Sequence, residues 1–446
     1  MLGTLKKIYQ WFPKKLVTPF FKFFQVTPVF SDRHWKKVRA LKVCLDQGFT
    51  LEDIKKKLKD LAFLIKEIEF YKDMSYGTFI ANPNLNSLWS LPIIDSEVVR
   101  NNFEEIIDPS IHGYYTTTGG SGRNPLKLYL SNKSYFTDRT HAFYAWSLLG
   151  YRKGDLKLTL RGVNLKNKLV SYNPMNNEIN VNVFLLNERN IKLIVQKINK
   201  YKPNFGHGYP SAWYTLAQLL SQNNLKLDTN LKGIYFASES IQSKKRDFIE
   251  KVFQTTARST YAFSERACFA YELPDKKGFY KVSLNYGLVE ILKEDNSSAK
   301  VGEMGEIVCT GFINKAMPLI RYRTGDFAKV TKIFNGLIIE FSHLKGRWGK
   351  DYILDYNGDR IFTTSINIHS EAQFEFKYIQ LYQNEKGKLL IKLVPFDNLR
   401  ETSLKIVSKE FKEKLPGIDV DVKIVDIDNL YCTNRGKVPY LVKNKI

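Results

Sequence analysis

The chain contains few cysteines, and their spacing excludes two kinds of small structural site. Cys44, Cys268, Cys309 and Cys432 lie far apart in the 446 residues, and no two of them form a CxxC pair. Zinc modules and disulfide frameworks need cysteines at short, recurring spacings. We therefore expect neither of them, and isolated thiols of this kind favour a protein of the reducing cytoplasm.

Long apolar runs are also missing. Pro13, Pro19 and Lys22 interrupt the first apolar stretch, well short of the roughly 20 residues that a membrane-spanning helix needs. No signal-peptide cleavage pattern follows this stretch. Neither a membrane-spanning segment nor a secretion signal is predicted.

Acidic residues are outnumbered, 45 against 68 lysines and arginines, which gives a formal net charge of +23. Such a surface attracts nucleic acid, an anionic membrane or anionic small molecules. The chain has no helix-turn-helix, RNA-recognition signature or zinc finger, so we do not expect nucleic-acid binding. A plainly solvated basic surface is the alternative.

The first 40 residues form a basic, aromatic arm that carries one acidic residue, Asp32. Three roles fit this composition: the arm packs on its own domain, contacts a partner protein, or binds the inner face of the cell membrane. In the last case each cation near anionic lipid contributes about 1 kcal/mol. The basic residues are Lys6, Lys7, Lys14, Lys15, Lys22, Arg33, Lys36, Lys37 and Arg39.

The order of the predicted elements indicates an α/β protein of more than one domain. Residues 51–71 and 135–149 have helical periodicity, and short strand-like runs then alternate with helical segments such as 211–221 and 243–253, which is typical of βα units and a largely parallel sheet. Beyond residue 345 the pattern changes to two hairpins and a helix. We expect a large domain over residues 41–345 and a small, mobile α+β domain over residues 346–446. The joint LKGRWGKDY contains glycines and charges, so it is either a hinge or a plain linker.

The run TTTGGSGRNP, from Thr116 to Pro125, is the clearest candidate for a binding loop. Successive backbone N–H groups in a glycine-rich loop form an anion site, and hydroxyls and Arg123 add donors. Strand-like sequences flank the run, so we expect the loop at the tip of a β-hairpin. The Walker pattern GxxxxGK[ST] is absent, which disfavours a P-loop ATPase.

Five short motifs follow the loop in a fixed order, and each is weak alone: YFASES, TYAFSE, RYRTGD, GRWGKD and RGK. Together with the loop, from about residue 110 to the end, they resemble the adenylate-forming superfamily of acyl and aryl CoA ligases. Within that superfamily the chain is most similar to phenylacetate-CoA ligase-like proteins of the capsular polysaccharide biosynthesis branch.

The resemblance implies a two-step reaction. A carboxylate first attacks the α-phosphate of ATP to give an acyl-adenylate, and an acceptor then displaces AMP after the small domain rotates. The acceptor is CoA, the thiol of a carrier protein, or an amine on a sugar nucleotide. ATP, CoA and acidic carrier proteins are polyanions, which a basic surface attracts.

The resemblance also implies a role for particular residues. Tyr261 would stack on adenine, Asp326 would bind the ribose hydroxyls, and Glu265 would hold Mg²⁺, a hard ion that takes carboxylate oxygen. Arg347 would contact ribose or phosphate, and Lys437 would reach the α-phosphate and the substrate carboxylate. The other expected nucleotide contacts are Thr117, Thr118, Gly119, Gly120, Ser121, Gly122 and Arg123 around the phosphates, and Ala237, Ser238, Glu239, Ala262 and Ser264 around the adenine. The expected acyl-pocket residues are His207, Gly208 and Tyr209.

The chain departs from the superfamily pattern at several positions. Gly122-Arg123 replaces the usual Thr-Gly or Gly-Lys, Ala262 replaces a glycine, and the hinge stretch carries one extra residue. No counterpart is found for the cysteine and histidine cluster of some relatives, so Mg²⁺ is the only metal expected. The departures motivate an alternative function, a catalytically decayed adenylate fold that binds nucleotide or assembles with a partner.

Overall fold

The computed structural model describes most of the chain, and its residues divide into two compact units. The described residues are 32–118, 126–163, 165, 167–174, 176–239, 241, 243–345, 352–363, 366, 368, 370–395, 400–431 and 440–443. The first unit takes its described residues from 1–48, 136–237 and 241–260, and the second from 49–135, 238–240 and 261–446. Most of the basic arm therefore lies outside the described residues.

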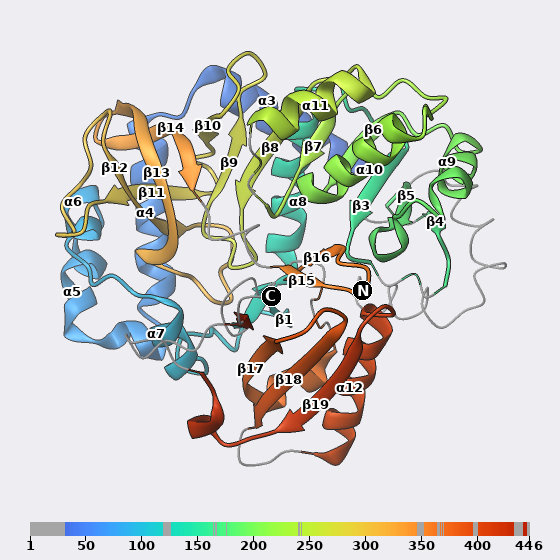
Figure 1. Cartoon of the computed structure of the whole chain (residues 1–446). Helices are drawn as coiled ribbons and strands as arrows, with labels where there is room; N and C mark the ends of the chain where they lie inside the picture. The colour runs from blue at the N-terminus through green and yellow to red at the C-terminus, as the bar shows by residue number, and fades with distance from the viewer. Residues whose placement is uncertain are drawn as a thin grey trace. The chain divides into compact units, whose positions relative to one another are not determined.

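The first unit contains a mainly parallel sheet with the strand order β8-β7-β6-β3-β5-β4 (Figure 1). Its strands are β3 (Lys157–Arg161), β4 (Val170–Asn173), β5 (Glu178–Asn182), β6 (Phe205–Gly208), β7 (Ile234–Phe236) and β8 (Ala257–Ala262), whose last two residues belong to the second unit. Only β4, which pairs with β5, is antiparallel in this sheet. The helices of the unit are α3 (Asp32–Gln47), α8 (Asn132–Ser147), α9 (Ile191–Asn199), α10 (Pro210–Gln222) and α11 (Ser243–Phe253). The prediction of βα units with a parallel sheet is confirmed.

The two faces of this sheet differ in chemistry, because successive side chains of a strand point to opposite faces. One face is apolar: Leu158, Leu160, Ile179 and Val181 are fully buried in one cluster with side chains of α9, α10 and α11. On the other face, β3 and β5 are polar at every alternate position, and β6 carries one polar residue beside the apolar Phe205. The polar residues are Lys157, Thr159, Arg161, Glu178, Asn180, Asn182 and His207.

The second unit contains an antiparallel sheet with the order β11-β12-β13-β14-β10-β9. The strands are β9 (Phe269–Glu272), β10 (Phe279–Val282), β11 (Gly287–Leu292), β12 (Met304–Gly311), β13 (Tyr322–Phe334) and β14 (Leu337–Lys345). Its helices are α4 (Leu51–Ile65), α5 (Met74–Ala81), α6 (Leu85–Trp89) and α7 (Ser96–Asn101). Helix α4 begins in a capping box between Thr50 and Asp53, and its buried face joins the core of the sheet.

A β-hairpin flanks the predicted phosphate loop. Strands β1 (Gly113–Thr117) and β2 (Lys127–Ser131) are antiparallel, with Thr117 opposite Lys127. The hairpin prediction is confirmed, while residues 119–125 at its tip lie outside the described residues.

The C-terminal part of the second unit has a hydrophobic cluster of its own, with members from Ile353 to Tyr440. Its strands are β15 (Tyr352–Leu354), β16 (Arg360–Phe362), β17 (Phe376–Gln383), β18 (Lys388–Pro395), β19 (Asp419–Ile424) and β20 (Leu441–Lys443), and its helix is α12 (Glu401–Lys414). The last four strands form a sheet in the order β19-β18-β17-β20 (Figure 1). This is the small α+β domain that the sequence predicts, while its exact boundaries and its mobility remain predictions.

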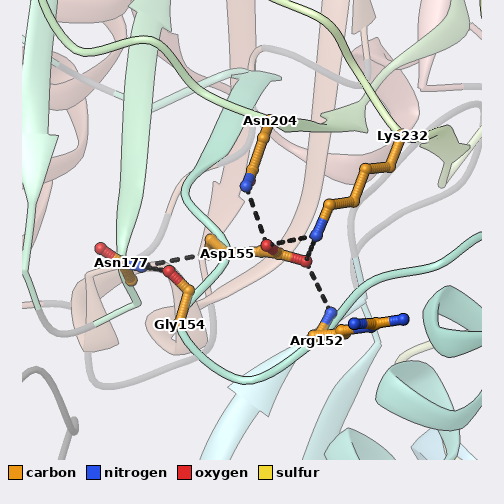
Figure 2. Close-up of polar contacts among 6 residues, drawn as sticks. All are labelled: Arg152, Gly154, Asp155, Asn177, Asn204 and Lys232. Atoms are coloured by element: carbon orange, nitrogen blue, oxygen red, sulfur yellow. Dashed lines mark hydrogen bonds and ion pairs between the residues drawn. The ribbon is translucent and has the colours of Figure 1, made fainter.

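A buried carboxylate links the amino ends of several strands in the first unit (Figure 2). Asp155, in the turn before β3, accepts hydrogen bonds from the Arg152 backbone N–H at 2.6 Å and from Asn204 Nδ2 at 2.8 Å. Lys232 Nζ lies 2.8 and 3.0 Å from its two oxygens. Asn177, before β5, donates to the carbonyl of Asp155 at 3.0 Å. Since Asn204 precedes β6 and Lys232 precedes β7, one carboxylate fixes the start of neighbouring strands.

Replacing Asp155 with asparagine should destabilise the protein by about 2–4 kcal/mol. The native carboxylate accepts from several donors, whereas the amide of asparagine has an NH₂ group in place of one of the two accepting oxygens. Urea unfolding measures this free energy. Asp228→Asn is the matched control, since Asp228 pairs with Lys202 at 3.2 Å and both side chains are about 70% exposed. The control should change the free energy of unfolding by less than about 0.5 kcal/mol, and equal effects of the two variants would contradict the role of Asp155.

Candidate functional site

The expected acyl-pocket residues lie at the carboxyl end of β6 in the first unit. Ligands of open α/β sheets bind beyond the carboxyl ends of parallel strands. Gly208 ends β6 with φ +138°, and a Cβ there would lie 2.1 Å from the carbonyl oxygen of Leu160 in β3. The N–H of Tyr209 donates to the same oxygen at 2.8 Å. Only glycine permits this close approach of two strands, and Pro210 then begins α10.

His207 is buried on the polar face of the sheet and is held as a neutral ring. Its Nδ1 lies 3.0 Å from the carbonyl oxygen of Tyr235 and must therefore donate to it. Trp146 covers the ring with centroids 4.8 Å apart. Burial, together with the nearby Arg161 charge, holds the pKa of His207 well below its usual range. The imidazole thus acts as a hydrogen-bonding group and not as a cation.

His207 lines a small pocket of the first unit whose empty volume, partly open to solvent, is about 220 Å³. Phe143 and Trp146 of α8 form its aromatic wall. The polar groups of the lining are Arg139, Lys157, Arg161, Asn176, Glu178 and His207. Gly208 and Tyr209 shape the end of β6 but are not among the lining residues.

The second unit brings Tyr261 and Asp326 together. The Tyr261 hydroxyl donates to Asp326 Oδ2 at 3.0 Å, and both side chains are buried. Burial, and next the Asp326 charge, raise the pKa of Tyr261 well above its ordinary value, so the phenol stays protonated. The Tyr261 ring contacts Phe263 and Phe341 edge to face, with centroids 5.7 and 5.8 Å away.

Asp326 lies at an irregularity in β13. The pairing of β12 with β13 shifts between Glu306 and Val308, and Gly325 has φ +75°. Such bulges bend a strand and re-aim a side chain. Here the Asp326 N–H is bonded to Thr324 Oγ1 at 3.1 Å, and Thr324 donates to the carbonyl of Ile307 at 2.8 Å. The TGD motif is therefore a bulge that presents one carboxylate.

Glu265 is tied to the same strand. The hydroxyl of Tyr322, the first residue of β13, donates to Glu265 Oε1 at 3.0 Å. The next residue, Arg266, has φ +56° and donates to Ser134 Oγ at 2.9 Å and to the Tyr114 hydroxyl at 3.1 Å. Tyr114 belongs to β1, so Arg266 connects the segment that carries Glu265 with the hairpin below the phosphate loop.

Thr118 closes the neck of that hairpin. Its N–H donates to the Leu126 carbonyl at 3.0 Å, and its hydroxyl accepts the Leu126 N–H at 2.8 Å. Thr117 donates instead to Gln373 Oε1 at 3.2 Å. Within the second unit, contacts thus link the hairpin, Glu265, β13 and Asp326.

The remaining predicted site residues lie in one unit or the other, or outside the described part of the chain. Ala237 follows β7 in the first unit, and Ser238, in the second, has φ +69°. Glu239 and Ser264 are half-buried, and Ala262 is exposed. Gly119, Gly120, Ser121, Gly122, Arg123, Arg347 and Lys437 lie outside the described residues, and their roles remain predictions.

Among the described residues no group of three or more histidines, cysteines, aspartates or glutamates could hold a metal ion. Mg²⁺ bound to a nucleotide needs only one or two carboxylates, because phosphates and water complete its octahedron. Glu265, a half-buried carboxylate oriented by Tyr322, fits that requirement.

The structure adds residues that the motifs did not identify. Tyr322 and Arg266 orient Glu265, and Arg321 forms a buried bidentate pair with Glu290 at 2.8 and 3.0 Å. Arg321 also donates to the Leu91 carbonyl, so the first arginine of RYRTGD anchors the fold. The charged pocket residues on β3 and β5 were missed too, although alternate positions of KLTLR and EINVN are polar.

Solved structures share this architecture. A structure of 2-hydroxyisobutyryl-CoA ligase with 2-HIB-AMP and CoA in the thioesterification state has a TM-score of 0.54 at 17% identity, covering 89% of this chain and 91% of that chain. A structure of the same ligase in the postadenylation state has a TM-score of 0.52 at 16% identity, covering 88% and 89%. The fold is therefore that of the adenylate-forming, acyl-CoA ligase-like proteins.

Sequence comparison with individual proteins agrees with this class. Protein CapK of Staphylococcus aureus is 23% identical over an alignment of 436 residues that covers 93% of each chain. The D-alanine–D-alanyl carrier protein ligase of Bacillus anthracis is 27% identical over an alignment of 241 residues that covers 47% of this chain and 46% of that protein. No protein-family model matches the chain. The predicted resemblance to the adenylate-forming superfamily is confirmed, and the phenylacetate-CoA ligase-like subtype stays a prediction.

Among the described residues, no helix is long and apolar enough to cross a bilayer.

Replacing Tyr261 with phenylalanine should lower the free energy of unfolding by about 1–3 kcal/mol, because the buried Asp326 carboxylate loses a donor. Urea unfolding tests this. Tyr356→Phe serves as the control, since that side chain is 60% exposed and its replacement should stay within about 0.5 kcal/mol. An unchanged midpoint for Tyr261→Phe would show that its hydroxyl does not stabilise Asp326.

His207 should make the protein less stable in mild acid. Its pKa is lowered on folding, so its contribution is fully present above the unfolded value of about 6.5 and is lost as the pH falls below it. Below that pH the unfolding free energy of the wild type should fall by up to about 1.4 kcal/mol per pH unit because of His207, which corresponds to the uptake of one proton on unfolding. His207→Asn should lose this part of the pH dependence. Unfolding free energies of both proteins at pH 7, 6 and 5 give this slope, and parallel curves would contradict the neutral buried imidazole.

Proposed function

We propose that the chain is an enzyme that activates a carboxylic acid with ATP as an acyl-adenylate and transfers the acyl group to an acceptor. The observation that carries the proposal is the linkage in the second unit, where Thr118, Glu265 and Asp326 belong to elements joined by side-chain hydrogen bonds. A phosphate-binding hairpin, a magnesium carboxylate and a ribose carboxylate are the parts that adenylation requires. The fold and the sequence similarity support the same class.

In this proposal each described residue has a defined task. The hairpin closed by Thr118 holds the β- and γ-phosphates, and Glu265 supplies an oxygen for Mg²⁺, which neutralises charge on the α-phosphate. Asp326 accepts the ribose hydroxyls, and Tyr261 fixes its orientation in addition to the predicted contact with adenine. Ala237, Ser238 and Glu239 border the adenine.

The C-terminal domain supplies Lys437 for the first half-reaction. A point charge beside the α-phosphate and the substrate carboxylate stabilises the negative charge that develops between them. Arg347, near the predicted hinge, contacts the ribose or phosphate. Rotation of the small domain then withdraws Lys437 and admits the acceptor.

The acceptor we favour is a thiol, of CoA or of a carrier protein. The ligase that shares the fold has structures with CoA, and the Bacillus anthracis relative is named for a carrier protein. Transfer to the amine of a sugar nucleotide, in cell-surface polysaccharide biosynthesis, is the other acceptor proposed from the family resemblance. The function of genes beside this one tests that role, and a neighbourhood for aromatic-acid breakdown would count against it.

ATP–pyrophosphate exchange tests the activity. We expect exchange that depends on one of a panel of short fatty, aryl, hydroxy and amino acids, and a loss of about a hundredfold or more in Glu265→Gln, because the metal loses its carboxylate. Glu294→Gln, at an exposed surface position, is the matched control and should keep full exchange.

Lys437→Ala should abolish exchange and yet still form thioester from a synthetic acyl-adenylate. Binding of ATP without exchange for any acid would favour the decayed adenylate fold instead, and retention on DNA with neither activity would favour a nucleic-acid binder.

A further inference from the structure

The pocket on the polar face of the first unit carries an excess of positive charge. Its lining has three basic side chains, Arg139, Lys157 and Arg161, and one carboxylate, Glu178. The neutral His207 adds no charge. Cations of one sign in a partly enclosed site are costly unless an anion compensates them.

The single carboxylate is already engaged by neighbours. Glu178 Oε1 accepts from Asn173 at 2.9 Å and from Asn176 at 3.0 Å, and Oε2 accepts from Thr159 at 3.2 Å. Although burial opposes ionisation, the charges of Arg161 and Lys157 hold the pKa of Glu178 below its usual range. Glu178 is therefore ionised, and its single negative charge is shared mainly by Arg161 and Lys157.

Lys157 is the cation closest to complete burial. Its ammonium donates to the carbonyl of Asn176 and lies 3.5 Å from the Tyr151 hydroxyl. Burial lowers its pKa to about 8, so it remains largely charged at neutral pH. It lies opposite Glu178 in the pairing of β3 with β5.

The Arg161 charge also acts on Glu178, but Arg161 lacks the hydrogen-bond partners that Lys157 has. It ends β3, at the carboxyl edge of the sheet, and its Nε is buried without a hydrogen-bond partner among the described residues. A buried donor that lacks an acceptor is uncommon in native proteins. A guanidinium presents paired N–H groups that match the two oxygens of a carboxylate or a phosphate.

The aromatic wall of the pocket strengthens the electrostatic effect of these cations. Phe143 and Trp146 are almost fully buried, and Trp35 of α3 stacks on Phe143 with centroids 5.4 Å apart. Charges interact more strongly beside such low-dielectric walls than in open water. The empty volume of the pocket includes open solvent, so it does not fix the length of a bound molecule.

We propose that this pocket binds a carboxylate or phosphate group through Arg161 and Arg139, and that this group is a second anion on the acid that the chain activates. The second half of the proposal rests on the proposed function and on the expectation, from the sequence, that His207 belongs to the acyl pocket. The activated acid would then be at least dianionic, unlike a simple fatty or aryl acid.

Calorimetry on the full chain tests the anion site without any catalysis. The probes are succinate and butyrate, which have four carbons each and differ in the distal group, and inorganic phosphate. Succinate or phosphate should bind at least tenfold more tightly than butyrate, and Arg161→Gln and Arg139→Gln should each weaken that binding roughly tenfold or more. Arg189→Gln, at an exposed position of the same unit, should bind as wild type does.

Circular dichroism and thermal unfolding establish that each variant is folded. Because Arg139 and Arg161 are tested separately, one variant that fails to fold leaves the other to decide. Equal binding of succinate and butyrate, or anion binding that neither substitution weakens, would overturn the anion site.

Exchange assays with the same acids distinguish the source of the anion. A lower KM for succinate than for butyrate, lost in Arg161→Gln, would establish the second anion as part of the substrate. Arginine-dependent anion binding with equal exchange for both acids would overturn that half and leave a separate anion site. If no acid supports exchange, the proposed function fails, and calorimetry alone then tests whether the pocket binds an anion.

Discussion

The arrangement of the first unit depends on how its parallel strands are aligned, and one buried carboxylate fixes that alignment. Asp155 binds groups that precede or begin β3, β6 and β7, so these strands start at the same level. Their carboxyl ends then also coincide, with Leu160 opposite Gly208 and Arg161 opposite Asn182. The pocket at that edge is a consequence of contacts made at the opposite edge of the sheet.

Much of the fold could be predicted because the local patterns and the tertiary structure agree. The loop at a hairpin tip, the parallel βα units and the C-terminal hairpins all follow from periodicity and turn residues. The helix predicted over residues 51–71 ends earlier, at Ile65, because the chain turns and the N–H of Phe70 bonds to the carbonyl of Glu105. A contact 35 positions away outweighs the apolar periodicity there.

The partners of the site residues could not be predicted, because they join segments far apart in the chain. Nothing local pairs Tyr322 with Glu265 or Arg266 with Tyr114. The polar pocket is a different case, since its signal is present in the strands themselves. A parallel strand covered on both faces should be apolar throughout, whereas β3 alternates Lys157, Thr159 and Arg161 with leucines. That departure indicates that this face of the sheet lines a binding site and does not only pack against a helix.

The neck of the hairpin separates the residues that pair the two strands from the residues that are expected to bind the ligand. Thr118 and Leu126 close the ladder with two hydrogen bonds, so the strands are complete before the glycine-rich tip begins. These closing hydrogen bonds are made by Thr118 and Leu126 themselves and use no side chain from the run between them. We therefore expect the sequence of that run, including Gly122-Arg123, to vary with the bound molecule among homologues, while Thr118 is retained.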